Sequence, residues 1–375
     1  MTKFYILKSG YIPDNASTIR FMGMLKAFSD KGIDAEVIFF MSDKNNSEAP
    51  QLPHISYHYY WKNFNVKNEK LKILLYLIVF SRLFYSKLKA GDTVYLYGCN
   101  EMISRLVNIE GIRVFHERTE HPLVSKLKLL NVRKYLNACT KLDGLFVISS
   151  ALKEYFDSIG VSADKVHIIN MTVDASRFES LVKKPSERYI AYCGKATNNK
   201  DGVDQLIKSF AITLKTHPDV KLYIIGTPPR KADESGNLEL VESLGITDKV
   251  VFTGVIPSEQ IPQVLKNAEI LALNRPDNMQ AKYGFPTKLG EYLLTGNPVV
   301  ITRVGDIPLF LKDGENALIA SPNEPVTFAE KVNWLLDNQQ EAIIIGANGV
   351  GVAKRNFDSM IEAQKMIRIM FNKYF

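Results

Sequence analysis

The feature that most constrains the fold of this chain is an alternation of short apolar runs with amphipathic stretches, repeated in two series. Such alternation is typical of α/β units built around a parallel sheet. The predicted strands are residues 3–10, 34–40, 92–98, 112–117 and 144–149 in the first series, and 189–194, 220–226, 249–254, 269–274, 298–302 and 317–321 in the second. Each series opens with a strand, a glycine-containing loop, an amphipathic helix and another strand. The sequence therefore predicts two Rossmann-like domains that face each other across a cleft at the carboxyl ends of both sheets.

A polar, proline-containing segment at residues 178–188 separates the two series. We expect an N-terminal domain over residues 1–182, a second domain over 183–357, and a C-terminal helix over 358–375 that packs back on the first domain. The length of 375 residues supports two domains, because it exceeds what one hydrophobic core usually organises. Neither domain opening contains the GxGxxG fingerprint of NAD-binding proteins.

Cysteine and histidine usage argues against a disulfide framework and a metal centre. The three cysteines, Cys99, Cys139 and Cys193, are odd in number and form no CxxC pair. His54 and His58 would share one face of a helix, but the stretch SYHYYW at residues 56–61 favours a strand. The start of the chain lacks the pattern of a signal peptide, and the longest uncharged apolar run, residues 73–81, is about half of the roughly 20 residues that span a bilayer. We expect a cytoplasmic protein.

A basic excess lies in the middle of the first series, where residues 62–134 carry 14 Lys and Arg against six Asp and Glu. Residues 67–89 and 125–136 combine these cations with an apolar stripe. Such helices suit an anionic membrane surface, which would make the protein peripheral on the inner face of the cytoplasmic membrane. They equally suit ordinary helices that pack on a sheet with their Lys ammoniums in water. No nucleic-acid-binding motif accompanies the charge, so we expect no nucleic-acid partner.

Two stretches of the second series carry binding chemistry. CGKATNNKDGVDQLI places Lys195 and Lys200 between a strand and a helix amino end, where cations and free N–H groups can bind a diphosphate. In YGFPTKLGEY, Thr287 is placed to cap a helix that begins near Lys288. Glu291, one turn further on, could accept two hydrogen bonds from a vicinal diol such as a ribose. The alternatives are a solvated turn for the first stretch and a capped helix that faces water for the second.

These stretches together resemble the family 4 retaining glycosyltransferases, two-domain enzymes of the GT-B fold. GFPTKLGEYLLTGNPVVIT followed by VGDIPLFLKDGENALIASP is similar to their donor-site signature, and CGKATNNKDGVDQLIKSF to their Arg/Lys-x4-Lys phosphate loop. The resemblance is strong over residues 144–357 and loose in the first domain. It implies that a sugar is transferred from a nucleotide-sugar donor with retention at the anomeric carbon.

Carried over to this sequence, the resemblance makes Lys195 and Lys200 ligands of the donor diphosphate that stabilise the leaving nucleotide. Glu291 would hold the ribose, and residues 251–254 would lie beside the base. The backbone of residues 284–288 would face the sugar and the phosphates. The donor-binding residues that this implies are Gly10, Gly194, Lys195, Lys200, Gly284, Phe285, Pro286, Thr287, Lys288 and Glu291.

The sequence departs from the family pattern at three places. The first Glu of the Glu-x7-Glu motif, which usually contacts the donor sugar, is replaced by Tyr283, so that this contact would pass to Gln280, Lys282 or the backbone. Ala16 and Ser17 stand where the family has a glycine pair in its first loop, and NMTVD replaces the usual Asn-Gly-Val-Asp turn.

The first domain should supply the acceptor side and a polar group near the anomeric carbon. VFHERTEHP at residues 114–122 is the best candidate, with His116 at a strand end where the family often has a sugar-contacting histidine, and Glu120 as a second base or positioning group. The catalytic residues that we predict are therefore His116, Glu120, Lys195 and Lys200. The alternative is a cluster of salt bridges at a strand end.

We expect electrostatic stabilisation of the departing diphosphate to carry most of the rate, with no protein nucleophile. No Asp-x-Asp is present at a strand end to bind a metal, so we expect neither metal nor cofactor besides the nucleotide-diphosphate sugar. The predicted function is a retaining hexosyltransferase that acts on a saccharide or lipid-linked saccharide in polysaccharide or glycolipid synthesis. The alternatives are a nucleotide-sugar epimerase of the same fold and a non-catalytic protein that binds nucleotide sugars or glycans.

Overall fold

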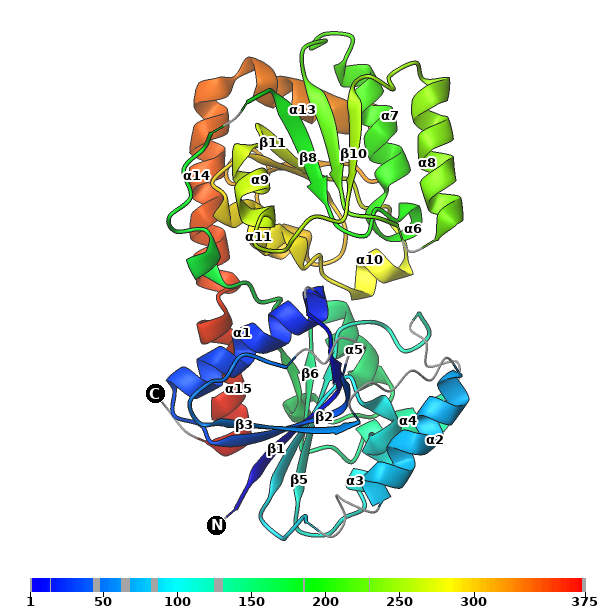
Figure 1. Ribbon diagram of the computed structural model, residues 1–375, viewed down its shortest axis with the longest axis vertical. Coiled ribbons are helices and arrows are strands. Elements are labelled where there is room, and N and C mark those ends of the chain that lie inside the picture. Colours follow the sequence, from blue (N-terminus) through cyan, green and yellow to red (C-terminus); the bar gives the residue numbers. More distant parts are fainter. Residues whose placement is uncertain are drawn as a thin grey trace. The chain divides into compact units, whose positions relative to one another are not determined.

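The computed structural model describes residues 2–13, 15–42, 48–61, 68–81, 87–124, 131–184, 186–228 and 230–372. The chain divides into two compact units, which are Met1–Thr172 together with Ser359–Phe375, and Val173–Asp358 (Figure 1). The first unit thus ends at residue 172, before the predicted boundary at 182. The difference arises because the intervening segment is hydrogen-bonded to the second unit, for example from Gln263 Nε2 to the Val182 carbonyl over 3.0 Å.

The described part of the first unit contains a parallel sheet of seven strands in the order β3-β2-β1-β4-β5-β6-β7. The strands are β1 Phe4–Tyr11, β2 Ala35–Ser42, β3 Ile55–Trp61, β4 Thr93–Tyr97, β5 Arg113–Arg118, β6 Gly144–Val147 and β7 Val166–Ile168. The predicted strands are confirmed, including the one at SYHYYW. The edge strand β7 was not predicted from the sequence.

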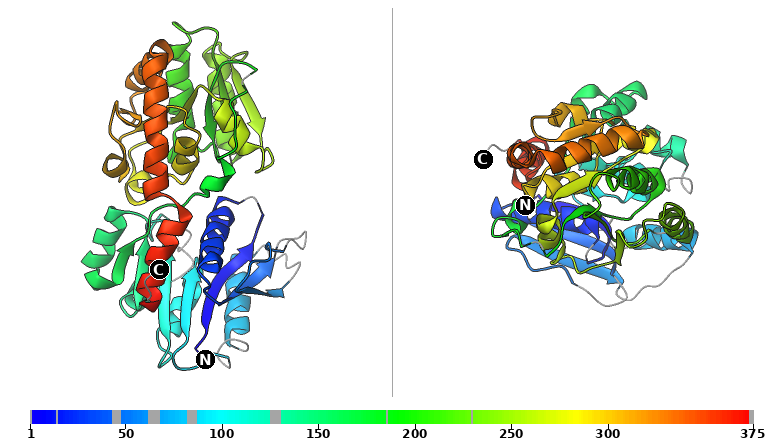
Figure 2. Two further views of the ribbon diagram at one scale, coloured as in Figure 1. Left: turned by 90° about the vertical axis from the view of Figure 1, so that its left-hand side faces the viewer. Right: turned by 90° about the horizontal axis from the view of Figure 1, so that it is seen from above.

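The helices of the first unit are α1 Ala16–Asp30, α2 Glu69–Val79, α3 Ile103–Leu106, α4 Val132–Cys139, α5 Ser150–Ser158 and α15 Ser359–Phe371. The Asn15 side chain caps α1 by accepting a hydrogen bond from the Ser17 amide over 2.9 Å. The C-terminal helix α15, red in Figure 2, packs on α1. Met366, Ile367 and Met370 of α15 are buried in the core of the first unit.

The second unit contains a parallel sheet of six strands in its described residues, in the order β10-β9-β8-β11-β12-β13. The strands are β8 Tyr189–Cys193, β9 Lys221–Ile225, β10 Val250–Gly254, β11 Ile270–Leu273, β12 Val299–Thr302 and β13 Leu318–Ala320. All six strands predicted for the second series are confirmed to within one or two residues. Near-continuous burial along β11 and β12 agrees with a parallel sheet that is covered on both faces.

The helices of the second unit are α6 Asn198–Asp201, α7 Val203–Thr213, α8 Lys231–Ser243, α9 Ile261–Asn267, α10 Met279–Tyr283, α11 Lys288–Leu294, α12 Ile307–Phe310, α13 Pro325–Asp337 and α14 Gln339–Asn356. Helix α7 packs against α8 and α13, and α11 packs against α14. Figure 1 shows α7 and α8 side by side along the sheet.

Both sheets reverse their strand order at one point. The chain moves from β1 to β2 and β3 and then returns to place β4 on the other side of β1; in the same way β11 returns to the free side of β8. Ligands of open parallel sheets bind outside the carboxyl ends of the strands at such a switch point. In the second unit this point is formed by the loops that follow β8 and β11.

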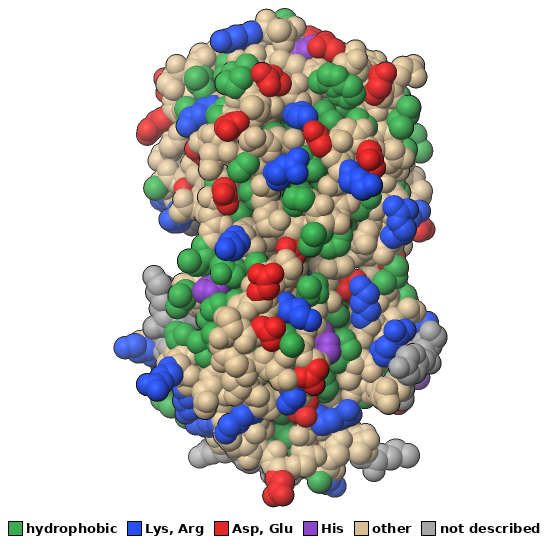
Figure 3. All heavy atoms as spheres, turned by 180° about the vertical axis from the view of Figure 1, so that it is seen from behind, with side chains coloured by type: hydrophobic (Ala, Val, Ile, Leu, Met, Phe, Trp, Pro, Cys, Tyr) green, Lys and Arg blue, Asp and Glu red, His purple; other side chains and the backbone are tan. Residues whose placement is uncertain are grey.

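The basic segments of the first unit are described only in part. Helix α2 lies within the predicted amphipathic segment 67–89, and α4 overlaps the segment 125–136 over residues 132–136, whereas residues 67, 82–86 and 125–130 of these segments lie outside the described residues. On the face drawn in Figure 3, Lys and Arg side chains are interspersed with Asp, Glu and hydrophobic side chains. Within the described ranges, none of the helices has the length and apolar character needed to cross a bilayer.

Candidate functional site

Close backbone packing joins the loops after β8, β9 and β11. Gly226 has φ +108°, and a Cβ atom there would lie 2.0 Å from the carbonyl oxygen of Gly194. Gly202, at the junction of α6 and α7, has φ +62°, and a Cβ atom there would lie 1.9 Å from the carbonyl oxygen of Asn274. Both positions therefore need glycine for their conformation and for the space around them. This packing holds the loop of Gly194 at the switch point of the sheet.

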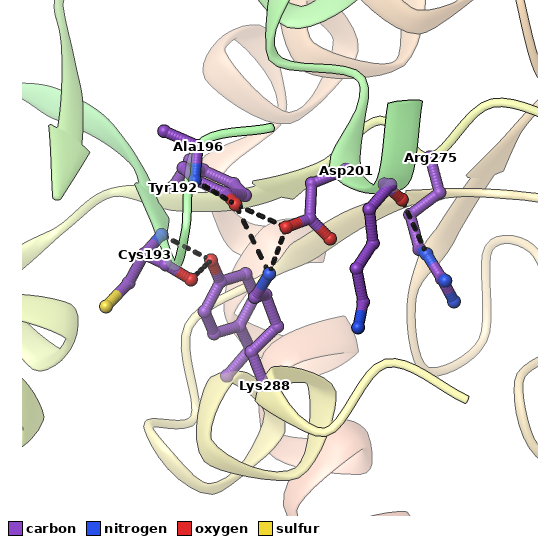
Figure 4. A network of polar contacts seen from close by, with 8 residues as sticks. Tyr192, Cys193, Ala196, Asp201, Arg275 and Lys288 are labelled. Atoms are coloured by element: carbon purple, nitrogen blue, oxygen red, sulfur yellow. Dashed lines mark hydrogen bonds and ion pairs between the residues drawn. The ribbon is translucent and has the colours of Figure 1, made fainter. Parts of the chain in front are cut away.

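A buried network of polar side chains spans this switch point (Figure 4). The Lys288 ammonium, from the first turn of α11, lies 2.7 Å from Asp201 Oδ2 of α6 and 3.2 Å from the Tyr192 hydroxyl of β8. The Tyr192 hydroxyl donates a hydrogen bond of 2.7 Å to the same Asp201 oxygen. Asp201 is only 3% exposed, so its charge is compensated within the protein and not by water.

The two charged groups of this network shift each other's pKa. Burial lowers the pKa of Lys288, and Asp201 opposes that effect. Burial alone would raise the pKa of Asp201, but the Lys288 ammonium and the hydrogen bonds from Lys288 and Tyr192 bring it below its usual value. A depressed carboxyl pKa and a distance of 2.7 Å to the Lys288 ammonium describe an ion pair in which each group favours the charged form of the other.

Two tyrosine hydroxyls fix the backbone of the loop after β8. The Tyr192 hydroxyl accepts a hydrogen bond from the Ala196 amide over 3.1 Å, and the Tyr292 hydroxyl of α11 accepts one from the Cys193 amide over 2.7 Å. Both tyrosines are fully buried, and burial raises the pKa of each, so the hydroxyls remain protonated. The loop that carries Lys195 is thus tied to α11 at its beginning and to β8 further on.

Arg275, in the loop after β11, supports the other side of the site. Its side chain is 2% exposed, and its Nε donates a hydrogen bond of 3.2 Å to the carbonyl oxygen of Lys200. The Nη1 atom of Arg275 is buried and has no hydrogen-bond partner among the described residues. Asn278, at the amino end of α10, donates from Nδ2 to the Asn199 carbonyl over 2.6 Å. The short helix α6 is therefore held by the loop that follows β11.

Glu291 lies one turn beyond Lys288 and has a charged partner. Its carboxylate is 2.6 Å from Arg177 Nη1, and Arg177 Nη2 donates to the Ser258 carbonyl over 2.9 Å. Burial raises the pKa of Glu291, while Arg177 and Lys288 oppose the increase. The Glu291 side chain is 22% exposed, so its remaining surface can reach a ligand.

The structure brings several of the predicted donor-binding residues together and leaves others untested. Lys288 of α11 approaches the loop of Gly194: a Cβ atom on Gly194 would lie 2.5 Å from the Lys288 ammonium. Lys195 is exposed, and Lys200 is close enough to Lys288 for its charge to lower the pKa of Lys288. Glu291 lies on the same helix, α11, as Lys288. That these groups bind a diphosphate and a ribose stays a prediction.

The predicted cap of α11 is wrong. Thr287 occupies the N-cap position, but its backbone is helical, with φ −62° and ψ −25°, and its side chain makes no capping hydrogen bond. A capping side chain needs an extended backbone at that position to reach the first-turn amides. Phe285 packs on Phe310 and Phe357, and Pro286 is buried, so these two side chains shape the turn after Gly284.

In the first unit, His116 lies in β5 and is fully buried. Its Nδ1 is 3.2 Å from the Leu96 carbonyl oxygen, and its Nε2 is 3.2 Å from the Tyr135 hydroxyl. Burial, with a smaller effect of Arg118, lowers the pKa of His116 to about 3. A neutral histidine in this position couples β4 to α4. Its catalytic role stays a prediction, and it would require Tyr135 to move away.

One neighbour of His116 forms a buried ion pair, whereas the alternative interpretation of this stretch expected a cluster of salt bridges. Glu117 is buried, makes an ion pair with Arg20 of α1, and accepts a hydrogen bond from the Tyr95 hydroxyl. Arg118 donates to the backbone carbonyl of Glu120 over 2.7 Å. The side chain of Glu120 is partly exposed, and its predicted catalytic role is untested.

Gly10 lies in β1 opposite Met41 of β2, and its predicted contact with the donor is likewise untested. Cys99, Cys139 and Cys193 are free thiols. In the described ranges, no group of three or more His, Cys, Asp and Glu side chains is placed to hold a metal ion.

Sequence reasoning missed four residues of the site: Tyr192, Asp201, Arg275 and Arg177. Asp201 directly follows Lys200 in the quoted phosphate loop, so a carboxylate among the lysines of this loop was a signal for an ion pair. Arg177 precedes the second series by several residues and carried no comparable signal. Tyr192 lies two residues before the end of the predicted strand 189–194, and Arg275 directly follows the predicted strand 269–274; ligand-binding residues of parallel sheets gather near such ends.

Comparisons with known proteins identify a family and relatives that are similar to parts of this chain. Residues 187–338 match the family model of the group 1 glycosyl transferases. The MMP alpha-(1->4)-mannosyltransferase of Mycolicibacterium hassiacum is 27% identical over 207 residues, which span 55% of this chain and 48% of that protein. The D-inositol 3-phosphate glycosyltransferase of Corynebacterium diphtheriae is 28% identical over 48% of this chain and 41% of that protein. The matched regions thus amount to less than half the length of these two relatives.

Solved structures match the whole chain. HepE of Anabaena in complex with UDP-glucose has a TM-score of 0.76 at 16% identity, with 100% of both chains covered. Sucrose-phosphate synthase of Thermosynechococcus elongatus has a TM-score of 0.78 at 16% identity, with 98% of both chains covered. The chain has the GT-B fold that its sequence predicted, with a glycosyl transferase family match confined to the second unit.

Proposed function

We propose that this protein is a retaining glycosyltransferase that moves a sugar from a nucleotide-diphosphate sugar to a saccharide or lipid-linked saccharide acceptor. The observation that carries the proposal is the network of Lys288, Asp201 and Tyr192 at the switch point of the second unit. It fixes α11 and the loop of Lys195 and Lys200 around one point, where a parallel sheet binds its ligand. The match of the same unit to a glycosyl transferase family and the fold shared with HepE support the transfer reaction.

The cationic groups at this point suit a diphosphate. Lys195 is exposed on the loop after β8, and Lys200 lies near the amino end of α11. Asp201 neutralises Lys288, so we assign the attraction of the donor phosphates to Lys195 and Lys200. Lys288 instead fixes the loop in the geometry that binding requires. Glu291 is the group that we assign to the ribose hydroxyls.

Electrostatic stabilisation of the departing nucleotide would then supply most of the rate enhancement. As the bond between the sugar and the diphosphate breaks, negative charge develops on the phosphate oxygen, and Lys195 and Lys200 lower the energy of that charge. The acceptor hydroxyl attacks from the face that the leaving group occupies and gives its proton to the phosphate oxygen. This route retains the anomeric configuration and needs neither a protein nucleophile nor a metal.

The first unit is the side on which we place the acceptor. Helix α2 exposes three apolar side chains, those of Leu71, Leu74 and Ile78, which follow one another at helical spacing on one face. Exposed lysines at positions 70, 87 and 89 add positive charge to the same part of the chain. An apolar stripe with cations beside it suits an anionic membrane, so a lipid-linked acceptor and polysaccharide or glycolipid synthesis are the context that we propose.

A thermal-shift panel of UDP, GDP, ADP, CMP and their common sugars tests the donor site, because a ligand of the native state raises the melting temperature. One family of nucleoside diphosphates should give a clear shift. If none shifts the melting temperature at millimolar concentration, the donor site is not functional. With a donor that does bind, NMR of the transfer product assigns its anomeric configuration. Inversion of that configuration would contradict the retaining route.

The donor identified in this panel also distinguishes a transferase from the two alternatives, an epimerase and a binding protein. An epimerase would exchange solvent hydrogen into the sugar without an acceptor, whereas a transferase would not. A binding protein would shift its melting temperature but release no nucleotide with any acceptor. Tyr283, which replaces a motif carboxylate, makes the release of free nucleotide the measurement that separates transfer from binding.

A further inference from the structure

A cavity of about 380 Å³ lies in the second unit, away from the switch point. Its lining includes Ile270, the first residue of β11, and Pro298, which precedes β12. The cavity is therefore at the amino ends of these strands, whereas the loops of Gly194 and Arg275 follow carboxyl ends. Its volume is within the range of cavities that bind small molecules.

Two lysines bring positive charge to this cavity. The Lys183 ammonium donates to Asn297 Oδ1 over 3.4 Å, and the Lys266 ammonium donates to the carbonyl oxygen of Thr295 over 2.5 Å. Among the described residues, no carboxylate oxygen lies within 4.0 Å of either ammonium. Burial lowers the pKa of Lys183, and the charge of Lys266 lowers it further. The two ammoniums thus repel each other beside neutral oxygens.

The acidic residue of the cavity is already paired. Both oxygens of Glu269 are bound by Arg188, from Nε over 2.8 Å and from Nη2 over 3.0 Å. Its attraction to Lys183 only partly offsets the burial of that ammonium. A further anion between Lys183 and Lys266 would relieve the repulsion between them.

The remaining wall is mostly apolar, with the amide side chain of Gln339 as its polar member. Leu335 and Leu336, at the end of α13, and Ala342, in the first turn of α14, are buried, and Ile343 beside them is 66% exposed. Cationic and apolar surfaces thus line one cavity, as they would for a ligand with a charged head and an apolar body.

We propose that this cavity binds a phosphate monoester that carries a compact apolar group, with the phosphate between Lys183 and Lys266 and the apolar group against Leu335 and Ala342. A phosphate dianion matches the two ammonium charges, and lysine binds phosphate well as a point charge. A carbonyl oxygen and an amide oxygen orient the two ammoniums, so the cations are held in place before a ligand arrives. This site is separate from the proposed donor site and does not depend on glycosyl transfer.

Isothermal titration of the full chain with phenyl phosphate tests the proposal. We expect one site on the wild-type protein, with affinity about tenfold lower in Lys183→Met, as for the loss of one charge-assisted hydrogen bond. Ala342→Phe, which fills the cavity, should abolish binding. Lys231→Met is the matched control, since Lys231 is exposed on α8 and does not line the cavity. Melting temperatures without ligand verify that each variant is folded.

Two further probes identify the source of the ester. Vesicles that contain phosphatidic acid present the same phosphate on a lipid. If the protein binds these vesicles but not phenyl phosphate, and Lys183→Met weakens vesicle binding, the ligand is a lipid. Titration with inorganic phosphate tests how much the apolar group contributes to the affinity. If inorganic phosphate binds as tightly as phenyl phosphate, the assignment of a phosphate ester is overturned. Absence of binding to both phenyl phosphate and the vesicles, or binding that Lys183→Met and Ala342→Phe leave unchanged, would overturn the site itself.

Discussion

The ammonium of Lys288 lies 2.7 Å from a carboxylate oxygen of Asp201, although the two residues are 87 positions apart in the chain. Both side chains are largely buried, with exposed fractions of 16% and 3%. This contact ties α11 to α6, and the tyrosine hydroxyls of Tyr192 and Tyr292 tie both helices to the loop after β8. The geometry of the proposed donor site depends on this ion pair.

Removing one partner of the pair should destabilise the protein strongly. Lys288→Met leaves the Asp201 carboxylate buried without its cation, which we expect to lower the free energy of unfolding by about 3–5 kcal/mol. The double variant Lys288→Met/Asp201→Asn removes both charges and should recover most of that loss. Urea unfolding at neutral pH measures both. A single variant as stable as the wild type would mean that the pair is not ionised.

Lys200→Ala should abolish binding of the nucleoside diphosphate while leaving the melting temperature nearly unchanged. Lys200 contributes charge near Lys288, and its side chain is only partly buried, so its loss costs little stability. The control is Lys208→Ala, a lysine of α7 whose ammonium lies 3.8 Å from Asp204. Donor affinity that is unchanged in Lys200→Ala, together with a lowered melting temperature, would refute its assigned role.

Glu291 should determine whether the ribose hydroxyls matter for binding. If its carboxylate accepts hydrogen bonds from them, the wild type prefers the nucleoside diphosphate over its 2′,3′-dideoxy analogue by roughly ten- to hundredfold. Glu291→Gln should lose most of this preference, because it weakens the acceptor and changes the pairing with Arg177. Competition titrations with both nucleotides give the ratio. An unaltered ratio in the variant would assign Glu291 to Arg177 alone.

Helix α2 should attach the protein to anionic vesicles. Replacing Leu71, Leu74 and Ile78 together by serine should reduce binding severalfold, because exposed apolar side chains supply the insertion energy. Binding by the wild type should weaken steeply with salt, since exposed charges are screened. Vesicle sedimentation measures both effects. Val255→Ser with Leu309→Ser, at exposed positions of the second unit, is the control. Vesicle binding that is absent, or that does not change with salt, would leave α2 as an ordinary surface helix.

His116 should make the protein sensitive to acid. Its pKa of about 3 in the folded protein lies below the ordinary histidine value of about 6.5, so the unfolded chain binds the additional proton between these pH values. Stability is then fully present above about pH 6.5 and falls below it by up to about 1.4 kcal/mol per pH unit.

His116→Gln should flatten this dependence between pH 6.5 and 5, as measured by urea unfolding at several pH values. The control is His58→Gln, at a side chain that is 42% exposed, which should leave the pH dependence of stability unchanged. A parallel slope in His116→Gln and the wild type would show that the pKa of His116 is the same in the folded and the unfolded protein.

The sequence was sufficient to predict the architecture, because apolar alternation is local and strong in the parallel strands. β12 is the clearest case, since all its residues are buried, as expected for a central strand of a covered parallel sheet. β7 was missed because three residues at a sheet edge, of which Ile168 is 38% exposed, produce no recognisable apolar run. Its pairing with β6 depends on tertiary structure alone.

The site was predictable where its chemistry is local and not where it depends on distant partners. Lys195 and Lys200 are recognised from a loop between a strand and a helix, and Glu291 from its position one turn into α11. Their spacing could not show that Lys288 is neutralised by Asp201, or that Arg177 lies 114 positions from the carboxylate that it binds. The cap predicted at Thr287 failed for the same reason, because residue type alone does not fix the backbone dihedral angles.

The two passages of the chain between the units lie side by side, since the Val173 amide donates to the Phe357 carbonyl over 2.8 Å and Val173 pairs with Asp358. The second unit is therefore an uninterrupted insertion with adjoining ends, and one gene fragment would encode all of it. The first unit is split, and a truncation before Ser359 would remove the buried Met366 and Met370 from its core. In a genetic screen we therefore expect variants whose second unit is exchanged with that of a relative to survive far more often than variants that lack α15.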